Sequence, residues 1–367
     1  MTEHLSEHPT GKKRALIAMS GGVDSSVAAY LMKAQGFDCM GVTMKLFTDD
    51  GDSMPRAHSC CSLDDVEDAR SVAYALGIPY HVFNFSERFE EDVINRFISS
   101  YENGITPNPC IDCNRYLKFD GLYRRAAALS YDYVVTGHYA GIVKDTGTGR
   151  LLLKKAADDT KDQSYVLYTL TQEQLAHTLF PLGGMEKTRA REIAEEQGFI
   201  NAKKHDSQDI CFVQDGDYAG FIEKRTGKSF PAGDFIDRNG QILGRHRGVI
   251  HYTIGQRRGL GLAFPEPMYV CAIDPVRNTV MLSPESGLYS DRLIAHDINL
   301  ISVPRIEGEM RIKAKIRYRQ REQWATVTQP EEDTLLVVFD EPQRAITKGQ
   351  SVVLYDGDTV VGGGTIS

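Results

Sequence analysis

Glycines and small polar residues follow a short apolar stretch near the start of the chain. Residues 15–19 are apolar, Ser20, Gly21 and Gly22 come next, and Asp24 opens a segment with helical apolar spacing. The pattern predicts a strand, a tight turn and a helix. Glycines let backbone N–H groups approach an anion, and a helix N-terminus adds the positive end of its dipole. The stretch therefore predicts a phosphate-binding loop, and it lacks the lysine of a Walker loop. An ordinary strand–turn–helix corner would have the same pattern.

Thiols come next among the residues that could do chemistry. Cys110 and Cys113 form a C-x-x-C pair in a segment stiffened by Pro107 and Pro109. The prolines predict an irregular chain up to Asn114, which would place Cys113 at the start of a helix, where a thiol loses its proton more readily. A nucleophile, a redox pair, half of a metal site and a structural pair all fit this spacing.

The remaining cysteines are less informative. Cys211 has apolar neighbours, which is more typical of a core residue than of a catalyst. Cys60 and Cys61 are adjacent, and neighbouring cysteines chelate one tetrahedral ion poorly, so a zinc site shared with the C-x-x-C pair is disfavoured.

Basic residues recur at every second position between residues 311 and 321. A strand through this segment would place all of them on one face, where they would bind a nucleic-acid backbone. They are Arg311, Lys313, Lys315, Arg317, Arg319 and Arg321. A second basic segment holds Arg245, His246, Arg247, Arg257 and Arg258. His246 and His251 are weighed as general bases, but histidines beside arginines are more often polar contacts.

Strands and helices alternate over about the first 150 residues. Strands are expected at 15–19, 38–47, 79–85 and 132–136, and helices at 62–76, 87–102 and 114–130. This order predicts an α/β fold with a doubly wound parallel sheet. Ligands of such sheets bind beyond the carboxyl ends of the strands, where the glycine loop, Met44, Gly137 and His138 are expected.

The texture of the chain changes after this region. Helical patterns at 162–170 and 187–197 give way near residue 228 to short strands, with a hairpin turn expected at 238–240. From about residue 286 the pattern is wholly β, with strands expected at 310–328, 334–339, 351–355 and 359–366. We therefore expect a catalytic domain over 1–216, a small central linking domain over 217–284 and a C-terminal β-barrel over 285–367.

Bulk composition excludes several classes of protein. The 367 residues carry a formal net charge of −8, which disfavours a nucleic-acid coat protein but permits a local basic face. Seven cysteines, an odd number, argue against a secreted disulfide framework and favour a reducing cytoplasm. Residues 1–13 are polar and no apolar run is long enough for a membrane span, so neither a signal peptide nor a membrane anchor is expected.

Several motifs, in order from about residue 14 to the end, carry a resemblance. They are SGGVDSS, GITPNPCIDCNRYLKFD, VVTGHYA, KDQSY, DSQDICF and HYTIGQRRGLG. The first resembles the pyrophosphate loop of the N-type ATP pyrophosphatases, and the set as a whole resembles the tRNA-specific 2-thiouridylases. The resemblance implies ATP-dependent transfer of sulfur to C2 of the wobble uridine of tRNA, with Mg²⁺ accompanying ATP. It implies tRNA, and a cysteine desulfurase or sulfur-relay protein as sulfur donor, as partners of a monomeric enzyme.

The same resemblance assigns residues to roles. A persulfide on Cys211 would deliver the sulfur, and Cys113 would attack that persulfide or assist its release, leaving a disulfide. ATP would be held by Ala18, Met19, Ser20, Gly21, Gly22, Val23, Asp24, Ser25, Met44 and Gly137. Asn108, Pro109 and Cys110 would approach the target base. Contacts with tRNA would come from His138, Lys161, Asp162, Gln163, Arg317, Tyr318 and Gln350.

Cys110 departs from the family pattern, in which aspartate is common at this position. Cys110, Cys113 and Cys211 could then present three thiolates to an iron–sulfur cluster whose open iron binds sulfide, a rival to the persulfide route. Two other functions remain open at this stage. One is a ligase of the same superfamily acting on a small molecule, and the other is a redox- or metal-sensing RNA-binding protein.

Overall fold

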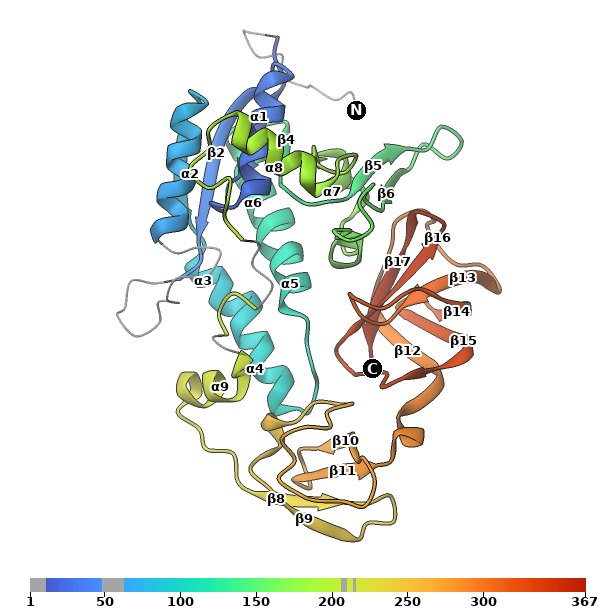
Figure 1. Cartoon of the computed structure of the whole chain (residues 1–367). Helices are drawn as coiled ribbons and strands as arrows, with labels where there is room; N and C mark the ends of the chain where they lie inside the picture. The colour runs from blue at the N-terminus through green and yellow to red at the C-terminus, as the bar shows by residue number, and fades with distance from the viewer. Residues whose placement is uncertain (1–10, 48–62, 206–209, 214–215) are drawn as a thin grey trace. The chain divides into compact units, whose positions relative to one another are not determined.

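The computed structural model describes residues 11–47, 63–205, 210–213 and 216–367 (Figure 1). Cys60 and Cys61 lie outside the described residues. The chain divides into two compact units. Unit 1 comprises residues 1–89 and 113–211, and unit 2 comprises residues 90–112 and 212–367.

Unit 1 is built on a five-stranded parallel sheet in the order β3-β2-β1-β4-β7. The strands are β1 (Arg14–Ala18), β2 (Asp38–Lys45), β3 (Tyr80–Asn84), β4 (Tyr133–Val135) and β7 (Thr178–Leu179). The chain leaves β1 first toward β2 and later returns on its other side at β4. This reversal of strand order confirms the predicted doubly wound α/β fold, and in such folds ligands bind at the carboxyl ends of the strands beside the reversal, here β1 and β4.

Helices flank this sheet because their apolar faces must be buried against it. Ile17 of β1 shares one buried cluster with Val27, Val72 and Ile193, which lie on three of the helices. The helical segments of unit 1 are α1 (Val23–Ala34), α2 (Leu63–Ala75), α3 (Ser86–Phe89), η2 (Cys113–Gly121), α6 (Leu122–Ala128), η3 (Ser164–Leu167), α7 (Gln172–Ala176) and α8 (Lys187–Glu196). The helix expected at 162–170 is only the single turn η3. An antiparallel hairpin, β5 (Gly141–Lys144) and β6 (Leu151–Lys154), follows β4.

Unit 2 begins with a helical segment and continues into a small sheet. Its helical segments are η1 (Glu90–Ile94), α4 (Asn95–Glu102), α5 (Pro109–Asp112), α9 (Tyr218–Thr226), η5 (Val249–His251) and η6 (Glu285–Leu288). The sheet has the order β10-β11-β8-β9, with β8 (Gly233–Ile236), β9 (Ile242–His246), β10 (Tyr269–Asp274) and β11 (Thr279–Ser283). Strands β8 and β9 form the predicted hairpin around residues 238–240, where Gly240 takes the left-handed conformation with φ of +83°.

Six antiparallel strands close the C-terminal part of unit 2 into a barrel. Their order is β12-β15-β14-β13-β16-β17, and β12 also pairs with β17. They are β12 (Tyr289–Leu300), β13 (Met310–Lys315), β14 (Gln323–Glu331), β15 (Thr334–Arg344), β16 (Ser351–Asp356) and β17 (Thr359–Ile366). The predicted β-barrel is therefore confirmed. Among the described residues, no helix is long and apolar enough to cross a membrane.

The predicted basic strand over residues 311–321 is only half right. Strand β13 ends at Lys315, and the expected alternation holds up to there, with Ile312 and Ala314 buried. The chain then turns, because the Gln320 side chain accepts a hydrogen bond from the Ile316 N–H at 3.2 Å. Arg317, Arg319 and Arg321 therefore lie outside the strand. One strand face carries three of the six cations, and Arg311 among them pairs with Asp340.

Candidate functional site

The glycine loop connects β1 to α1 and requires its glycines for two reasons. Gly21 has φ of +74°, a conformation that side chains rarely adopt. A Cβ atom on Gly21 would also collide with the backbone of Asp65. The Met19 N–H donates to the Val42 carbonyl at 2.8 Å, which fixes the start of the loop to β2. The predicted strand, turn and helix are thus all present.

Helix α1 begins directly after this loop, at Val23. The Gly22 carbonyl accepts hydrogen bonds from the hydroxyls of Ser25 (3.0 Å) and Ser26 (3.1 Å) and from the Ser26 N–H (3.3 Å). The serine hydroxyls therefore turn toward the loop carbonyl. No side chain caps the start of α1 in the described structure. Uncapped N–H groups at a helix start, joined to the helix dipole, suit an anion such as a phosphate.

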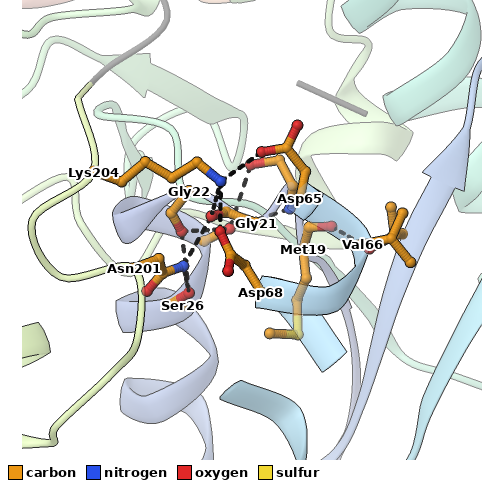
Figure 2. A network of polar contacts seen from close by, with 12 residues as sticks. Met19, Gly21, Gly22, Ser26, Asp65, Val66, Asp68, Asn201 and Lys204 are labelled. Carbon is orange, nitrogen blue, oxygen red and sulfur yellow. Dashed lines mark hydrogen bonds and ion pairs between the residues drawn. The ribbon is translucent and has the colours of Figure 1, made fainter. Parts of the chain in front are cut away.

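Asn201 and Lys204, which follow α8 in the chain, form hydrogen bonds with the glycine loop (Figure 2). The Asn201 side-chain amide donates to the Gly21 carbonyl and to the Ser26 hydroxyl, each at 2.9 Å. Lys204 Nζ reaches the same Gly21 carbonyl at 3.4 Å and pairs with Asp65 and Asp68 of α2 at 2.6 Å each. Since these donors occupy the Gly21 carbonyl, the loop orientation is fixed.

The charge of Lys204 is secured by its partners. Burial alone would lower the pKa of Lys204, but the hydrogen bonds and charges of Asp65 and Asp68 outweigh burial and raise it. The protonated Lys204 amine therefore joins Asp65 and Asp68 of α2 to the Gly21 carbonyl and holds the loop against that helix.

Asp24, in the first turn of α1, lies in a second polar cluster. Lys187 Nζ lies 2.7 Å from both carboxylate oxygens, and the Tyr139 hydroxyl donates to Oδ1 at 2.8 Å. The Lys187 side chain is only 9% exposed. Gly137 follows β4 and packs under this turn, because a Cβ there would lie 2.7 Å from the Ser25 nitrogen. The predicted rim residues Gly21, Asp24 and Gly137 are thus brought together.

Sequence reasoning missed Lys187, Asn201 and Lys204, which belong to no recognised motif. One signal was available for Lys187, the first residue of α8. A cation is unfavourable at the positive end of a helix dipole, so its position indicates an acidic partner elsewhere.

Met44 lies near the carboxyl end of β2 and is half-buried. Its neighbour Thr43 donates from Oγ1 to the Met19 carbonyl at 2.6 Å, and the Tyr80 hydroxyl donates to Thr43 at 2.6 Å. The end of β2 is therefore fixed to the start of the glycine loop, as expected for residues on one rim of a parallel sheet.

The C-x-x-C pair lies differently from the prediction. Helix α5 begins at Pro109, and the Asn108 side chain accepts a hydrogen bond from the Cys110 N–H at 3.2 Å. Proline suits the first helical position because its φ is preset and no N–H is needed there. The expectation that Cys113 starts the helix is therefore wrong. The helical backbone begins four residues earlier, and Cys113 is the first residue of the π-helical segment η2, which follows α5 directly. Cys110 is exposed, whereas Cys113 and Cys211 are half-buried.

A boundary between the two units falls between Asp112 and Cys113. Cys113 and Cys211 belong to unit 1, and Cys110 belongs to unit 2. In the described part of the chain, no group of three or more His, Cys, Asp or Glu side chains is placed to hold a metal ion.

Gln350 lies in the barrel turn before β16 and contacts the segment that leads to Asn108. Its Nε2 donates to the carbonyls of Thr106 at 2.9 Å and Pro107 at 3.2 Å. The Thr106 N–H donates in turn to the Lys348 carbonyl at 3.0 Å. Two of the predicted tRNA-site elements, Gln350 and the Asn108 segment, thus lie together in unit 2.

The predicted tRNA-contacting residues of unit 1 make contacts within that unit. His138 is buried, its Nδ1 lies 2.7 Å from the Thr136 hydroxyl, and burial followed by the charge of Lys118 lowers its pKa well below the usual range. The Gln163 side chain accepts from the Tyr139 N–H at 2.9 Å. Asp162 Oδ1 accepts from the Ser164 N–H at 3.1 Å. The neighbouring Lys161 is half-buried.

Of the barrel residues, Arg317 donates from Nη2 to the Arg344 carbonyl at 2.8 Å and to the Ala345 carbonyl. Tyr318 is 38% exposed. Both lie in the turn that follows β13.

Comparison with known protein families covers nearly the whole chain. Residues 13–215 match a family described as tRNA methyl transferase HUP domain, residues 219–284 the tRNA methyl transferase PRC-barrel domain, and residues 290–366 an aminomethyltransferase beta-barrel domain.

Curated relatives match over the same length. The tRNA-specific 2-thiouridylase MnmA of Clostridioides difficile (strain 630) is 56% identical over 354 residues, covering 96% of this chain and 98% of the relative. The protein of the same name from Acetivibrio thermocellus is 52% identical over 356 residues, covering 97% and 99%. That of Clostridium acetobutylicum is 49% identical over 354 residues, covering 96% and 99%.

Proposed function

The chain belongs to the tRNA-specific 2-thiouridylase family, and on this premise we propose that it uses ATP to replace O2 of the wobble uridine of tRNA with sulfur. The observation that carries the ATP-dependent part is the uncapped N-terminus of α1 behind Gly21 and Gly22. Family membership and the thiols Cys113 and Cys211 support the sulfur transfer.

In this proposal ATP is a substrate held along the rim of the parallel sheet. The loop from Ala18 to Ser25 binds its phosphates through backbone N–H groups, and Met44 and Gly137 lie beside the nucleotide. Mg²⁺ bound with ATP would supply positive charge against the phosphates. Lys204, 3.4 Å from the Gly21 carbonyl and paired with Asp65 and Asp68, holds the loop in its orientation.

The first chemical step activates an oxygen that is otherwise a poor leaving group. O2 of the uridine attacks the α-phosphorus of ATP, the bond to the β-phosphate oxygen breaks, and pyrophosphate leaves. The N3 proton of the base is released to solvent as the double bond shifts to N3. The oxygen now leaves C2 as part of AMP, which is the advantage of splitting one hard substitution into two easier ones.

The second step forms the carbon–sulfur bond. The terminal sulfur of a Cys211 persulfide attacks C2, and AMP leaves with the original O2. The Cys113 thiolate then attacks the Sγ of Cys211, so that the sulfur–sulfur bond to the base breaks and thiouridine is released after protonation. The product is a Cys113–Cys211 disulfide, which a two-electron thiol reductant must reduce before the next turnover.

Other participants follow from the same chemistry. The persulfide sulfur comes from a donor protein, either a cysteine desulfurase or a sulfur-relay protein. Asn108, Pro109 and Cys110 lie near the target base, and His138, Lys161, Asp162, Gln163, Arg317, Tyr318 and Gln350 contact tRNA. We further propose that the enzyme works as a monomer in the cytoplasm, where thiol reductants are available.

The test combines full-length protein, ATP with Mg²⁺, unmodified tRNA, a cysteine desulfurase with free cysteine as the source of persulfide sulfur, and a thiol reductant, under anaerobic conditions. Digested nucleosides are weighed by mass spectrometry, and AMP and pyrophosphate are followed in parallel. We expect about 16 mass units gained on the wobble uridine, the difference between sulfur and oxygen, and loss of this gain in Cys113→Ala and Asp24→Ala. Pyrophosphate release without thiouridine would uphold adenylation and indicate a missing donor. Absence of both products from wild-type protein would contradict the proposed function.

A further inference from the structure

A cavity of about 670 Å³ in unit 2 is lined by four arginines that converge from separate parts of the chain. Arg247 follows β9, Arg258 precedes β10, Arg317 lies in the turn after β13, and Arg344 ends β15. We call these four residues and the cavity that they line the arginine pocket. Like charges at such density are unfavourable without an anion, so this convergence indicates a ligand.

A close approach of two backbones brings these arginines together. A Cβ on Gly255 would lie 3.1 Å from the Cβ of Ala345, and Gly255 has φ of +86°. The Gly255 N–H donates to the Val270 carbonyl at 2.8 Å, and the Ala345 N–H donates to the Leu288 carbonyl at 2.7 Å. The loop that carries Arg258 is therefore held against the end of β15, where Arg344 lies.

Acidic residues compensate only part of this positive charge. Arg344 pairs through Nε with Glu285 at 3.0 Å and stacks over the Tyr269 ring. Asp217 also lines the pocket and accepts a hydrogen bond from the Gly220 N–H at the start of α9. Within the described residues, no carboxylate lies within ion-pairing distance of Arg247 or Arg258, and both of these side chains are exposed.

Neutral polar groups complete the lining. The pocket includes Tyr218, whose hydroxyl lies 3.3 Å from the Thr253 hydroxyl, and Gln256. A guanidinium presents its N–H groups in a planar fork that matches a phosphate, and hydroxyls and amides add further hydrogen bonds. The pocket is therefore chemically complementary to a phosphate group.

We propose that the arginine pocket binds a backbone phosphate of the tRNA substrate. The inference rests on the proposed function for the identity of the ligand. A volume of about 670 Å³ is larger than a single phosphate ion needs and has room for a nucleotide-sized segment. Because a phosphate contact carries no base information, the pocket positions tRNA rather than selecting its sequence.

The experiment measures the binding of unmodified tRNA to full-length protein over a series of salt concentrations. The test variant is Arg247→Gln/Arg258→Gln. The control is Arg277→Gln/Arg292→Gln, which removes the same charge from two exposed, ion-paired arginines of unit 2 outside the pocket. We expect the test variant to bind roughly tenfold more weakly at low salt, with a slope of log affinity against log salt shallower by about one. Affinity and slope of the control stay close to those of wild type.

Two results would overturn the proposal. The first is a test variant whose affinity and salt slope match the control. The second is a test variant that binds tRNA as tightly as wild type but no longer binds labelled pyrophosphate or inorganic phosphate. That result would assign the arginine pocket to a free anion. The thiolation assay of wild-type protein reports on the proposed function separately. If wild type forms thiouridine and the test variant binds tRNA like the control, only the assignment of the arginine pocket is wrong. If the test variant has the shallower salt slope but wild type forms no thiouridine, the proposed activity is wrong and the phosphate site is retained.

Discussion

Gln350 donates a hydrogen bond from Nε2 to the backbone carbonyl of Thr106, 2.9 Å away. A barrel residue therefore fixes the segment that ends in Asn108, Pro109 and Cys110. The family resemblance assigns Gln350 to tRNA, and the structure shows its amide donor directed at this segment. The two roles lead to different expectations.

Replacement of Gln350 by alanine separates these roles. If Gln350 positions the segment, Gln350→Ala slows thiolation by about tenfold while tRNA affinity changes less than twofold, since a small misplacement of reacting groups costs rate. Single-turnover thiolation and equilibrium tRNA binding measure the two quantities. A loss of affinity equal to the loss of rate would assign Gln350 to tRNA instead.

Substitution of Gly21 tests the close packing of the glycine loop against α2. Gly21→Ala introduces both a disfavoured backbone conformation and a collision with Asp65. Gly149, in the β5–β6 turn, has the same φ of +74° with no atom within 4 Å of an added Cβ, so Gly149→Ala isolates the conformational cost. We expect about 1 kcal/mol for Gly149→Ala and at least twice that for Gly21→Ala.

Urea unfolding gives the stabilities of both glycine variants, and pyrophosphate release gives their activity. Only Gly21→Ala should lose ATP turnover. Equal stability losses in the two variants would show that the contact with Asp65 does not constrain the loop.

Removal of Lys187 tests the pair with Asp24. Lys187→Met leaves the Asp24 carboxylate without its cation in a partly buried site and should cost about 2 kcal/mol of stability. Lys187→Met/Asp24→Asn should recover most of this loss, because the unpaired charge is gone, yet it should not recover ATP use. Arg189→Gln breaks the exposed ion pairs of Arg189 with Glu192 and Glu196 in α8 and should leave the stability close to that of wild type. A double variant as unstable as Lys187→Met would contradict this account.

His138 should make the stability of unit 1 depend on pH. Burial, and then the charge of Lys118, lower its pKa well below 6.5. As the pH falls below about 6.5, the unfolded chain takes up a proton that the folded protein refuses, so the free energy of unfolding decreases by up to about 1.4 kcal/mol per pH unit.

The effect is measured as the difference between variants. From pH 7.5 to 5.5, His138→Gln should lose less stability than wild type, whereas His81→Gln, at an exposed histidine, should follow wild type. Parallel curves for wild type and His138→Gln would show that His138 takes up its proton in the folded state as readily as in the unfolded state.

Cys110 distinguishes the persulfide route from the iron–sulfur alternative. The persulfide route uses Cys113 and Cys211, so Cys110→Ser should retain most thiolation activity while Cys113→Ser and Cys211→Ser lose it. Iron and labile sulfide are measured in the same anaerobically purified proteins. Iron in wild type that disappears in Cys110→Ser, together with lost activity, would favour the cluster.

The sequence predicted the fold class and the local structure of the glycine loop correctly, but not the long-range contacts of the site. Gly21, Gly22 and the apolar periods around them specify a strand, a turn and a helix without distant partners. The clamp on the loop depends on Asn201 and Lys204, which lie about 180 residues further along the chain, and no local pattern reports such a contact. The parallel α/β sheet was predicted from the alternation of strands and helices, whereas its strand order and the contacts of Lys187 required the tertiary structure.

Two boundary errors have identifiable causes. Arg317, Arg319 and Arg321 keep the spacing of the preceding strand although the chain turns at Ile316, and no glycine or proline marks that turn. Pro109 was interpreted as a residue that delays the helix, but proline is also favoured as a first helical residue. In both places the same sequence pattern is compatible with two different backbone conformations.

The division of the chain has a practical consequence for work with fragments. The backbone passes between the units three times, after Phe89, Asp112 and Cys211, so neither unit is one continuous piece. Within unit 2, Phe97 packs against Phe212 and Phe221, and Tyr101 stacks on Tyr218. An expression fragment cut near residue 215 would keep Phe97 and Tyr101 but remove Phe221 and Tyr218. Its exposed aromatic residues would favour aggregation, so the intact polypeptide is the unit to produce and study.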